Sequence, residues 1–451
     1  MRRNNLHLNI TQGVIFSSLL MVLFLFFFPA SRLMAGQLPT AQDSPEAVEL
    51  NEESTLSDYL AYAALHNPGL KAAFYRWQAA LARIPYVRAL PQPQLTFAYF
   101  IREIETRVGP QRGKVGIKQM FPWFDKPKLR GSAAEAFAEA EKHRFDAQKL
   151  ALFYRVKQAY FEHYFVLRTV ALLKESAALL KDREAALESK YRTGSASYAA
   201  LLKLQVEIDK LEERRQSAAA LLIPVKAALN AVLNRFLDAP LAEPRINIDK
   251  PRFFSTQLEN ILKKNNPALK SSTALIEKAK IDLKLAKRNY LPDFSLGVDY
   301  MITGETAMPG VPDSGKDPLA VMVSIHLPVW LKKNRAAVGA ADNRFLAALN
   351  RKQEEENKLL SRLQMVVYRF RDAERKMALY KDKLLPRAKQ ALEVTRSAFE
   401  TGSSDFLDFI DSQRTLLHFE LEYERARTDS ARGFAEIEML TGKHNPKEKE
   451  K

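Results

Sequence analysis

The chain contains one unit of about two hundred residues twice, and this internal repeat restricts its fold more than any other sequence feature. Four landmarks recur in the same order: Asn-Pro at 67–68 and 266–267, Leu-Pro at 90–91 and 291–292, a Pro-Trp or Pro-Val-Trp step at 122 and 328, and Thr-Gly-Ser at 193–195 and 401–403. The spacing between copies rises from 199 residues (Pro68 to Pro267) to 208 residues (Gly194 to Gly402) and never reverses. We therefore interpret the repeat as a gene duplication.

The repeat divides the chain into successive segments. We expect a first structural repeat at residues 36–236, a linker at 237–254, a second repeat at 255–442 and a disordered tail at 443–451. The linker contains three prolines, which break any helix because proline lacks the amide donor and clashes with the preceding turn.

Most of each repeat is predicted to be a long helical hairpin. Nine positions between Leu152 and Leu180 alternate by four and three residues and are almost all apolar, with His163 among them. This spacing is a heptad seam, which favours a packed or lumen-facing role for His163 over a metal-binding one. A helix that begins near residue 128 and continues to 188 would be about 90 Å long.

The hairpin tips are predicted where glycine interrupts the helices. We place the first hairpin at about 128–235 with its tip near Gly194, and the second at about 332–440 with its tip near Gly402. Pro386 lies within the second hairpin and is expected to bend it.

Each repeat also contains two strand-like runs, at about 94–102 and 113–121 in the first and at about 294–302 and 319–327 in the second. Apolar and polar residues alternate along them, so each strand has one apolar and one polar face. The polar side chains that could face a lumen are Ser295, Asp299, Ser324 and His326. This pattern is compatible with a half-buried soluble sandwich and with a membrane barrel.

Four strands are too few to close a membrane barrel, since the smallest single-chain barrels have about eight. An open sheet in hydrocarbon would leave the amides of its edges unsatisfied. Either the strands lie outside a membrane or several chains share one barrel, and three chains would supply twelve strands.

The N-terminus resembles a secretory signal peptide, which we place at residues 1–35. Arg2 and Arg3 precede an apolar run at 14–29 of about 16 residues, short of the roughly 20 that a spanning helix needs. A single membrane anchor is the alternative. No later uninterrupted apolar run is long enough to span, so we expect no conventional transmembrane helix in the mature chain.

Composition excludes several classes of chemistry. The chain has no cysteine, which excludes disulfides, thiolate metal sites and a lipid anchor on cysteine. Its net charge of +16 is spread among acidic residues, so we expect no nucleic-acid partner. Motifs for nucleotide binding, hydrolytic nucleophiles and zinc proteases are missing from the sequence. We therefore expect no enzyme activity, no cofactor and no bound metal, and any transport must draw energy from a partner.

These landmarks, from Leu56 to Gly442, resemble the TolC family of outer-membrane efflux proteins. The resemblance implies a mainly helical chain with a small transmembrane β part, which forms a homotrimer with a twelve-stranded barrel in the outer-membrane lipid and a twelve-helix tunnel through the periplasm. It also implies passive export together with a periplasmic adaptor protein and an inner-membrane pump. The alternative is a soluble periplasmic coiled-coil adaptor, which would require a compact β-rich domain.

Two sets of residues carry functional expectations from this resemblance. Thr193-Gly194-Ser195 and Thr401-Gly402-Ser403 match the periplasmic entrance, where adaptor hairpins dock, although ordinary helix turns would look the same. Asp408 and Asp411 match the aspartate rings that constrict the entrance, and a solvated acidic helix face is the alternative. The first tip has Ala200 and Lys203 at the same offsets, so the acidic pair occurs in one repeat only.

Overall fold

The computed structural model describes residues 49–246, 255–401 and 403–442. The predicted signal peptide, the C-terminal tail, residues 247–254 of the linker and Gly402 lie outside the described residues. The chain divides into two units, Met1–Glu49 and Leu50–Lys451, and the description below concerns the second.

The described elements of the second unit follow the duplication. The first repeat contains α2 (Leu56–His66), α3 (Pro68–Arg88), β1 (Gln94–Ile104), β2 (Gln111–Phe121), α4 (Lys126–Arg192) and α5 (Tyr198–Leu233). The second contains α6 (Ser255–Asn265), α7 (Pro267–Arg288), β3 (Asp293–Thr303), β4 (Leu319–His326), α8 (Leu331–Leu379), the π-helical segment η1 (Tyr380–Leu384), α9 (Leu385–Glu400) and α10 (Phe406–Thr441). Mainly helical structure with two strand hairpins confirms the predicted fold class.

The repeated Asn-Pro pairs each end one helix and begin the next. The Asn67 side chain accepts a hydrogen bond from the Leu70 amide at 3.0 Å and donates one to the Val232 carbonyl at 2.9 Å. Asn266 likewise accepts from the Ala268 amide and donates to the Leu440 carbonyl, at 2.9 and 2.8 Å. Each asparagine thus caps a helix and fixes it to the end of the last helix of its own repeat.

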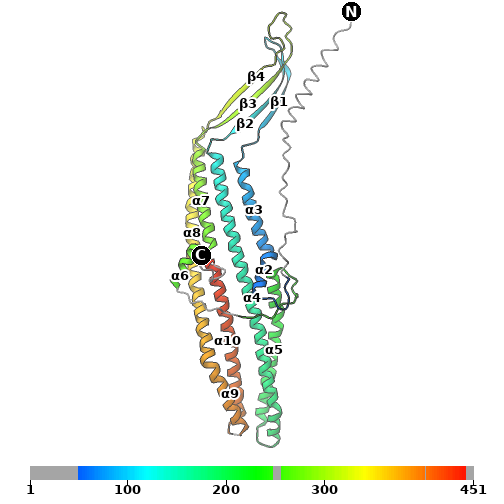
Figure 1. Ribbon diagram of the computed structural model, residues 1–451, viewed down its shortest axis with the longest axis vertical. Coiled ribbons are helices and arrows are strands. Elements are labelled where there is room, and N and C mark those ends of the chain that lie inside the picture. Colours follow the sequence, from blue (N-terminus) through cyan, green and yellow to red (C-terminus); the bar gives the residue numbers. More distant parts are fainter. Residues whose placement is uncertain (1–48, 247–254, 402, 443–451) are drawn as a thin grey trace, which may run out of the picture. The chain divides into compact units, whose positions relative to one another are not determined.

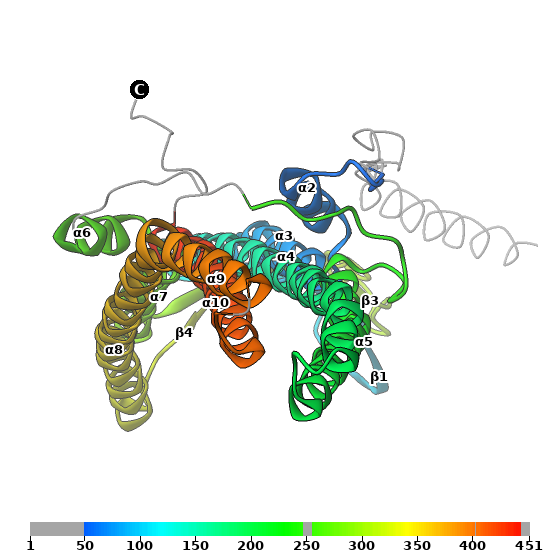
Figure 2. The same cartoon turned by 90° about the horizontal axis from the view of Figure 1, so that it is seen from below.

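Helix α4 is the central rod of the unit. Its 67 residues span about 100 Å at 1.5 Å per residue. It contacts α3, α5, α7 and α10, and the predicted seam is buried from Leu152 to Leu180, with only Ala159 and Val170 partly accessible. Viewed along their axes, the helices form a curved layer with α2 and α6 on its convex side (Figure 2).

The second hairpin departs from regular α-helix at the predicted position. The π-helical segment Tyr380–Leu384 separates α8 from α9 and directly precedes Leu385 and Pro386. A proline cannot donate to the carbonyl one turn back, and the wider π turn accommodates that missing bond.

The four strands form one antiparallel sheet in the order β1-β2-β3-β4, at the opposite end of the unit from the hairpin tips (Figure 1). Strands β2 and β3 pair directly from Phe121 and Phe294 to Gln111 and Thr303, so the sheet joins the two repeats. Strands β1 and β4 are the free edges of this open sheet.

One described helix has the length and composition of a membrane span. Helix α5 contains a stretch that is long and apolar enough to cross a membrane, and most of this stretch is not buried within the chain. We expected no such helix because no later segment of the chain approaches 18 uninterrupted apolar residues. Helices that pack against other protein satisfy the same criterion, so this finding is weak evidence for a span.

Candidate functional site

The described residues of the two hairpin tips share one hydrogen-bond pattern. The Ser195 amide donates to the Lys190 carbonyl and the Ser403 amide to the Ala398 carbonyl, both at 2.8 Å. The side chains of Thr193 and Thr401 each bond carbonyls of the preceding helical turn and the hydroxyl of the serine two residues later. These bonds satisfy carbonyls that a helix C-terminus leaves free.

Gly194 supplies the conformation that the first turn requires. Its φ is +75°, a region that side-chain-bearing residues adopt only with strain. A Cβ atom at this position would meet nothing within 4 Å. Glycine is therefore required by the positive φ of the turn and not by a lack of space for a side chain.

The two tips lie at the same end of the unit (Figure 1), and side chains next to them are in contact. The Lys190 ammonium, next to the first tip, donates to the Phe399 carbonyl at 2.7 Å and lies 4.0 Å from the centre of the Phe399 ring. Arg183 and Glu400 form a further ion pair at 3.5 Å. The two hairpins therefore end in one joint surface.

The predicted acidic pair lies in the first turns of α10, where both carboxylates line the same recess. Asp408 accepts a hydrogen bond from the Ser404 hydroxyl at 2.6 Å, and the Asp411 side chain is 83% exposed. The recess, of about 470 Å³, lies between α10 and α5, and Lys203 and Lys210 line its α5 side. The pair therefore faces basic groups of the other hairpin.

Sequence analysis missed an ion pair beside this recess. Arg414, on α10, donates to the carboxylate of Glu207, on α5, whose side chain is 9% exposed. The hydrogen bond from Arg414 is the main cause that lowers the pKa of Glu207. The partners are separated by 207 residues, so only the packing of α5 against α10 reveals the pair.

The strand candidates lie mostly together. Ser295 and Asp299 are 1% and 4% exposed on one face of β3, and Ser324 of β4 is the register partner of Ser295. Asp299 pairs with Lys114 of β2. His326 stands at the end of β4, opposite Asp293, and is exposed.

The opposite face of the sheet is apolar and open. Phe97 of β1, Leu296 of β3 and Val321 of β4 are 66%, 49% and 74% exposed. An apolar outer face and a polar inner face are the pattern of a membrane barrel, and the free edges require further strands from other chains.

Within the described residues, no three or more histidine, aspartate or glutamate side chains are grouped to hold a metal ion. His163 is packed at 2% exposure, as its seam position suggested, and neither ring nitrogen has a hydrogen-bond partner in the part of the chain that the structure describes. Burial lowers the pKa of His163 to about 4, so the ring is neutral at pH 7.

An open sheet with an apolar face, continued by long helical hairpins, defines a class of protein: a subunit that contributes part of a membrane barrel and part of a helical tunnel. Comparisons with known proteins agree. Residues 258–443 match the family model described as outer membrane efflux protein. The chain is 23% identical over 401 residues to the cobalt-zinc-cadmium resistance protein CzcC of Cupriavidus metallidurans, covering 86% of this chain and 90% of CzcC.

Solved structures show the same fold. The channel-forming protein CusC aligns with a TM-score of 0.72 at 16% identity, over 89% of this chain and 97% of CusC. The outer membrane protein VceC of Vibrio cholerae aligns with a TM-score of 0.72 at 16% identity, over 86% of this chain and 96% of VceC.

The chain has the fold of the TolC-like outer-membrane channels, and its residues 258–443 match the outer membrane efflux protein family. It is an outer-membrane channel subunit of a tripartite efflux system, and it extends into the periplasm. Members of this family form trimers and work with an adaptor and an inner-membrane pump. The main prediction is thus confirmed over the soluble adaptor alternative.

Proposed function

We propose that three copies of this chain form the channel and that Asp408 and Asp411 form its periplasmic constriction. The observation that carries the proposal is the position of both carboxylates on one face of α10, at the tip end of the unit and in one recess. Threefold symmetry turns the pair into two rings of three carboxylates. Close like charges repel one another and attract cations, so the constriction favours cations.

Single-channel recording of the reconstituted trimer tests this constriction. We expect Asp408→Ala combined with Asp411→Ala to raise the conductance and to weaken block by Mg²⁺ from the periplasmic side. The matched control is Asp382→Ala with Asp405→Ala, which removes two acidic side chains of the same hairpin that do not line the recess. Unchanged conductance in the first variant removes the gate assignment.

We also propose that the two tips, Thr193-Gly194-Ser195 and Thr401-Gly402-Ser403, dock the adaptor. Thr193, Ser195, Thr401 and Ser403 are exposed at the end of the unit most distant from the sheet, and their bonds leave the outer surface of each turn free. Because the chain has no cysteine, Ser195→Cys or Ser403→Cys introduces a single thiol.

A short thiol-to-amine crosslinker applied to cells tests the docking. We expect either variant to give an adduct of the channel with its adaptor, identified by mass spectrometry. Lys358→Cys, in the middle of α8, is the control and should give none. Export activity without any adduct from either tip would place the docking surface elsewhere.

For the cargo we propose divalent transition-metal cations. The support is the named activity of CzcC, whose length is matched almost completely, together with the acidic pair at the proposed constriction. In cells that lack the gene, we expect raised accumulation of zinc, cobalt or cadmium, and reintroduction of the gene should reverse it. Unchanged metal content with raised retention of an organic dye would identify a different cargo.

A further inference from the structure

The helix ends that adjoin the sheet carry only basic charge. The last six residues of α3 and α7 and the first six residues of α4 and α8 contain eleven lysines and arginines and no aspartate or glutamate. Over the whole chain the ratio is 69 to 53, so composition does not account for this separation. The charge is concentrated where the strands give way to helices.

Only three of the eleven have acidic partners. Ion pairs join Arg88 to Glu135, Lys126 to Asp293 and Arg288 to Asp125. The other eight make no ion pair among the described residues, and six of them define what we call the basic belt: Lys128, Arg130, Lys284, Lys287, Lys332 and Lys333. All six side chains are exposed.

Helix stability does not explain four of the six. Lys128 and Arg130 lie in the first residues of α4, and Lys332 and Lys333 in the first turn of α8. A helix N-terminus is the positive end of the helix dipole and favours acidic side chains. Basic side chains replace the favoured acidic ones at both of these helix N-termini, next to the sheet. A repeated departure from a local preference at one place in a molecule indicates a functional requirement.

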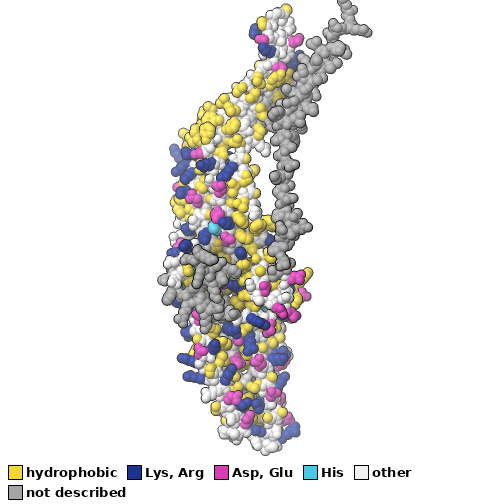
Figure 3. All heavy atoms as spheres, in the orientation of Figure 1, with side chains coloured by type: hydrophobic (Ala, Val, Ile, Leu, Met, Phe, Trp, Pro, Cys, Tyr) yellow, Lys and Arg dark blue, Asp and Glu magenta, His cyan; other side chains and the backbone are white. Residues whose placement is uncertain are grey.

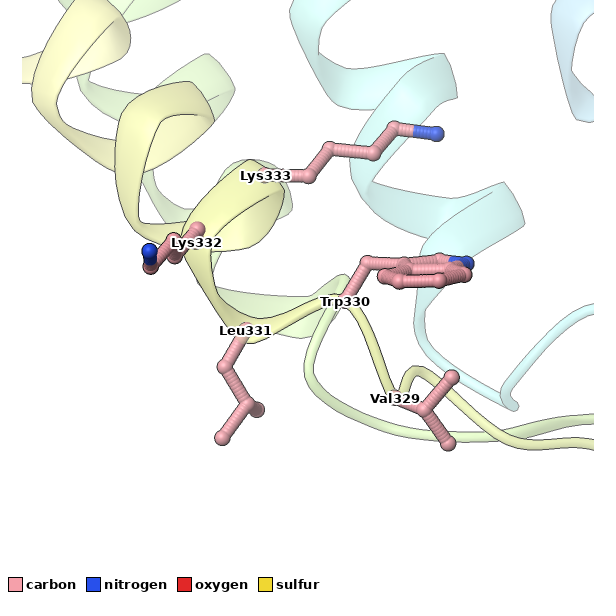
Figure 4. A pocket seen from close by; sticks show the side chains of 5 residues that line it. All are labelled: Val329, Trp330, Leu331, Lys332 and Lys333. Atoms are coloured by element: carbon pink, nitrogen blue, oxygen red, sulfur yellow. The ribbon is translucent and has the colours of Figure 1, made fainter.

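The belt borders a layer of exposed aromatic and apolar side chains. Trp330 and Phe124 are 75% and 85% exposed, and Leu331 is 61% exposed. Figure 4 shows the side chains around Trp330 in layers: Val329 and Leu331 point toward the strand side, the Trp330 ring lies in between, and Lys333 projects along the helix side. On the face shown in Figure 3, the apolar sheet surface is followed directly by basic side chains.

We propose that the basic belt binds anionic phospholipid headgroups of the membrane leaflet that faces the periplasm. The inference rests on the outer-membrane placement of the sheet. Apolar strands, then aromatic rings, then unpaired cations reproduce the order of acyl chains, interface and headgroups across one leaflet. The cations alone could bind a free anion, but a free anion would leave Trp330 and Leu331 exposed. A lipid covers these two side chains as well as binding the cations.

Tryptophan fluorescence measures this contact directly. The chain has three tryptophans, and replacing Trp77 and Trp123 by phenylalanine leaves Trp330 as the reporter beside the belt. The full trimer is reconstituted into phosphatidylethanolamine vesicles that contain the same mole fraction of brominated phosphatidylglycerol or brominated phosphatidylcholine. We expect the anionic lipid to quench Trp330 more, with a relative binding constant higher by at least about threefold, and salt to reduce that ratio.

A charge variant tests the belt itself. We expect the ratio of the two lipid binding constants to fall to near one in the triple variant Lys287→Gln, Lys332→Gln and Lys333→Gln. These lysines lie where α7 and α8 meet, since the Asn334 side-chain amide donates a hydrogen bond to the Asn289 carbonyl. Arg351→Gln, Arg369→Gln and Arg371→Gln remove the same charge from unpaired, exposed positions further along α8 and should leave the ratio unchanged. Inorganic phosphate at equal ionic strength should not compete.

Each contrary outcome has a separate meaning. Equal quenching by both lipids in the chain with an intact belt overturns the proposal, and competition by inorganic phosphate replaces it with a simple anion site. Absence of quenching by either lipid removes Trp330 from the membrane surface and with it the premise. Single-channel recording from the same vesicles reports separately whether the protein forms a channel.

Discussion

The two hairpin tips have the same hydrogen-bond pattern, but their aromatic side chains have opposite surroundings. The aromatic pair Tyr191 and Tyr198 of the first tip corresponds to Phe399 and Phe406 of the second, 208 residues later, with ring centres 5.5 and 4.8 Å apart. The tyrosines are 42% and 54% exposed, whereas the phenylalanines are 9% and 2% exposed. Both copies thus keep the contact between the two rings, but the phenylalanine pair is buried and the tyrosine pair lies at the surface.

Charge diverged at the same tips. Ser197 accepts a hydrogen bond from the Ala200 amide at 3.1 Å and caps α5. Asp405, at the equivalent position of α10, makes no side-chain cap, and Ser404 instead bonds Asp408. In the second tip, the serine before the helix thus donates its hydrogen bond to the Asp408 carboxylate, which the first tip lacks. A difference of this kind is expected where one copy supplies a constriction and the other supports it.

The largest expected effect comes from removing the buried ring. Phe406→Ala should lower the free energy of local opening of the second tip by about 3–5 kcal/mol, the usual cost of deleting a buried phenylalanine. Tyr198→Ala, the matched change in the first tip, should cost below about 1 kcal/mol because that ring is half exposed. Hydrogen exchange of the tip amides measures both. Equal losses of protection would show that the two rings pack alike.

Sequence analysis located the tips but not this difference. The Thr-Gly-Ser turns, the alternating strands and the heptad seam are local patterns, so they could be predicted. Burial of Phe406 and exposure of Tyr198 depend on how the hairpins pack against each other, which local periodicity does not specify. The direct pairing of β2 with β3 and the tie from Asn67 to Val232 are likewise contacts between distant segments.

The next effect concerns the ion pair between the hairpins. Arg414→Met leaves the buried Glu207 carboxylate without its partner and should destabilise the contact of α5 with α10 by about 1–2 kcal/mol, reduced from the 3–5 kcal/mol of fully buried pairs because Arg414 is half exposed. Hydrogen exchange of α5 amides near Glu207 measures the loss. Arg344→Met, on α8 and without an ion pair among the described residues, is the control.

The same pair predicts a pH dependence. Because Arg414 lowers the folded-state pKa of Glu207 below the ordinary value of 4.5, its stabilisation is fully present above that value. It is lost as the pH falls through the lowered pKa, where the folded carboxylate takes up its proton. In Arg414→Met the largest cause of the lowered pKa of Glu207 is removed, and only Lys210 and Arg214 still lower it against the effect of burial. This acid-dependent loss of protection should therefore become smaller. An identical profile in both proteins would contradict the assignment.

The smallest expected effect breaks the contact between the tips themselves. The Lys190 ammonium donates a hydrogen bond to the Phe399 carbonyl and lies over the Phe399 ring. The equivalent residue of the second repeat is Ala398, so the second tip makes no matching contact with the first. Lys190→Met should cost about 1 kcal/mol, which raises exchange of the Phe399 and Thr401 amides about fivefold. Lys203→Met, an equally large change on the first hairpin without such a contact, should leave those amides unchanged. If Lys190→Met also leaves them unchanged, the tips open independently, and the asymmetry between them has no mechanical consequence.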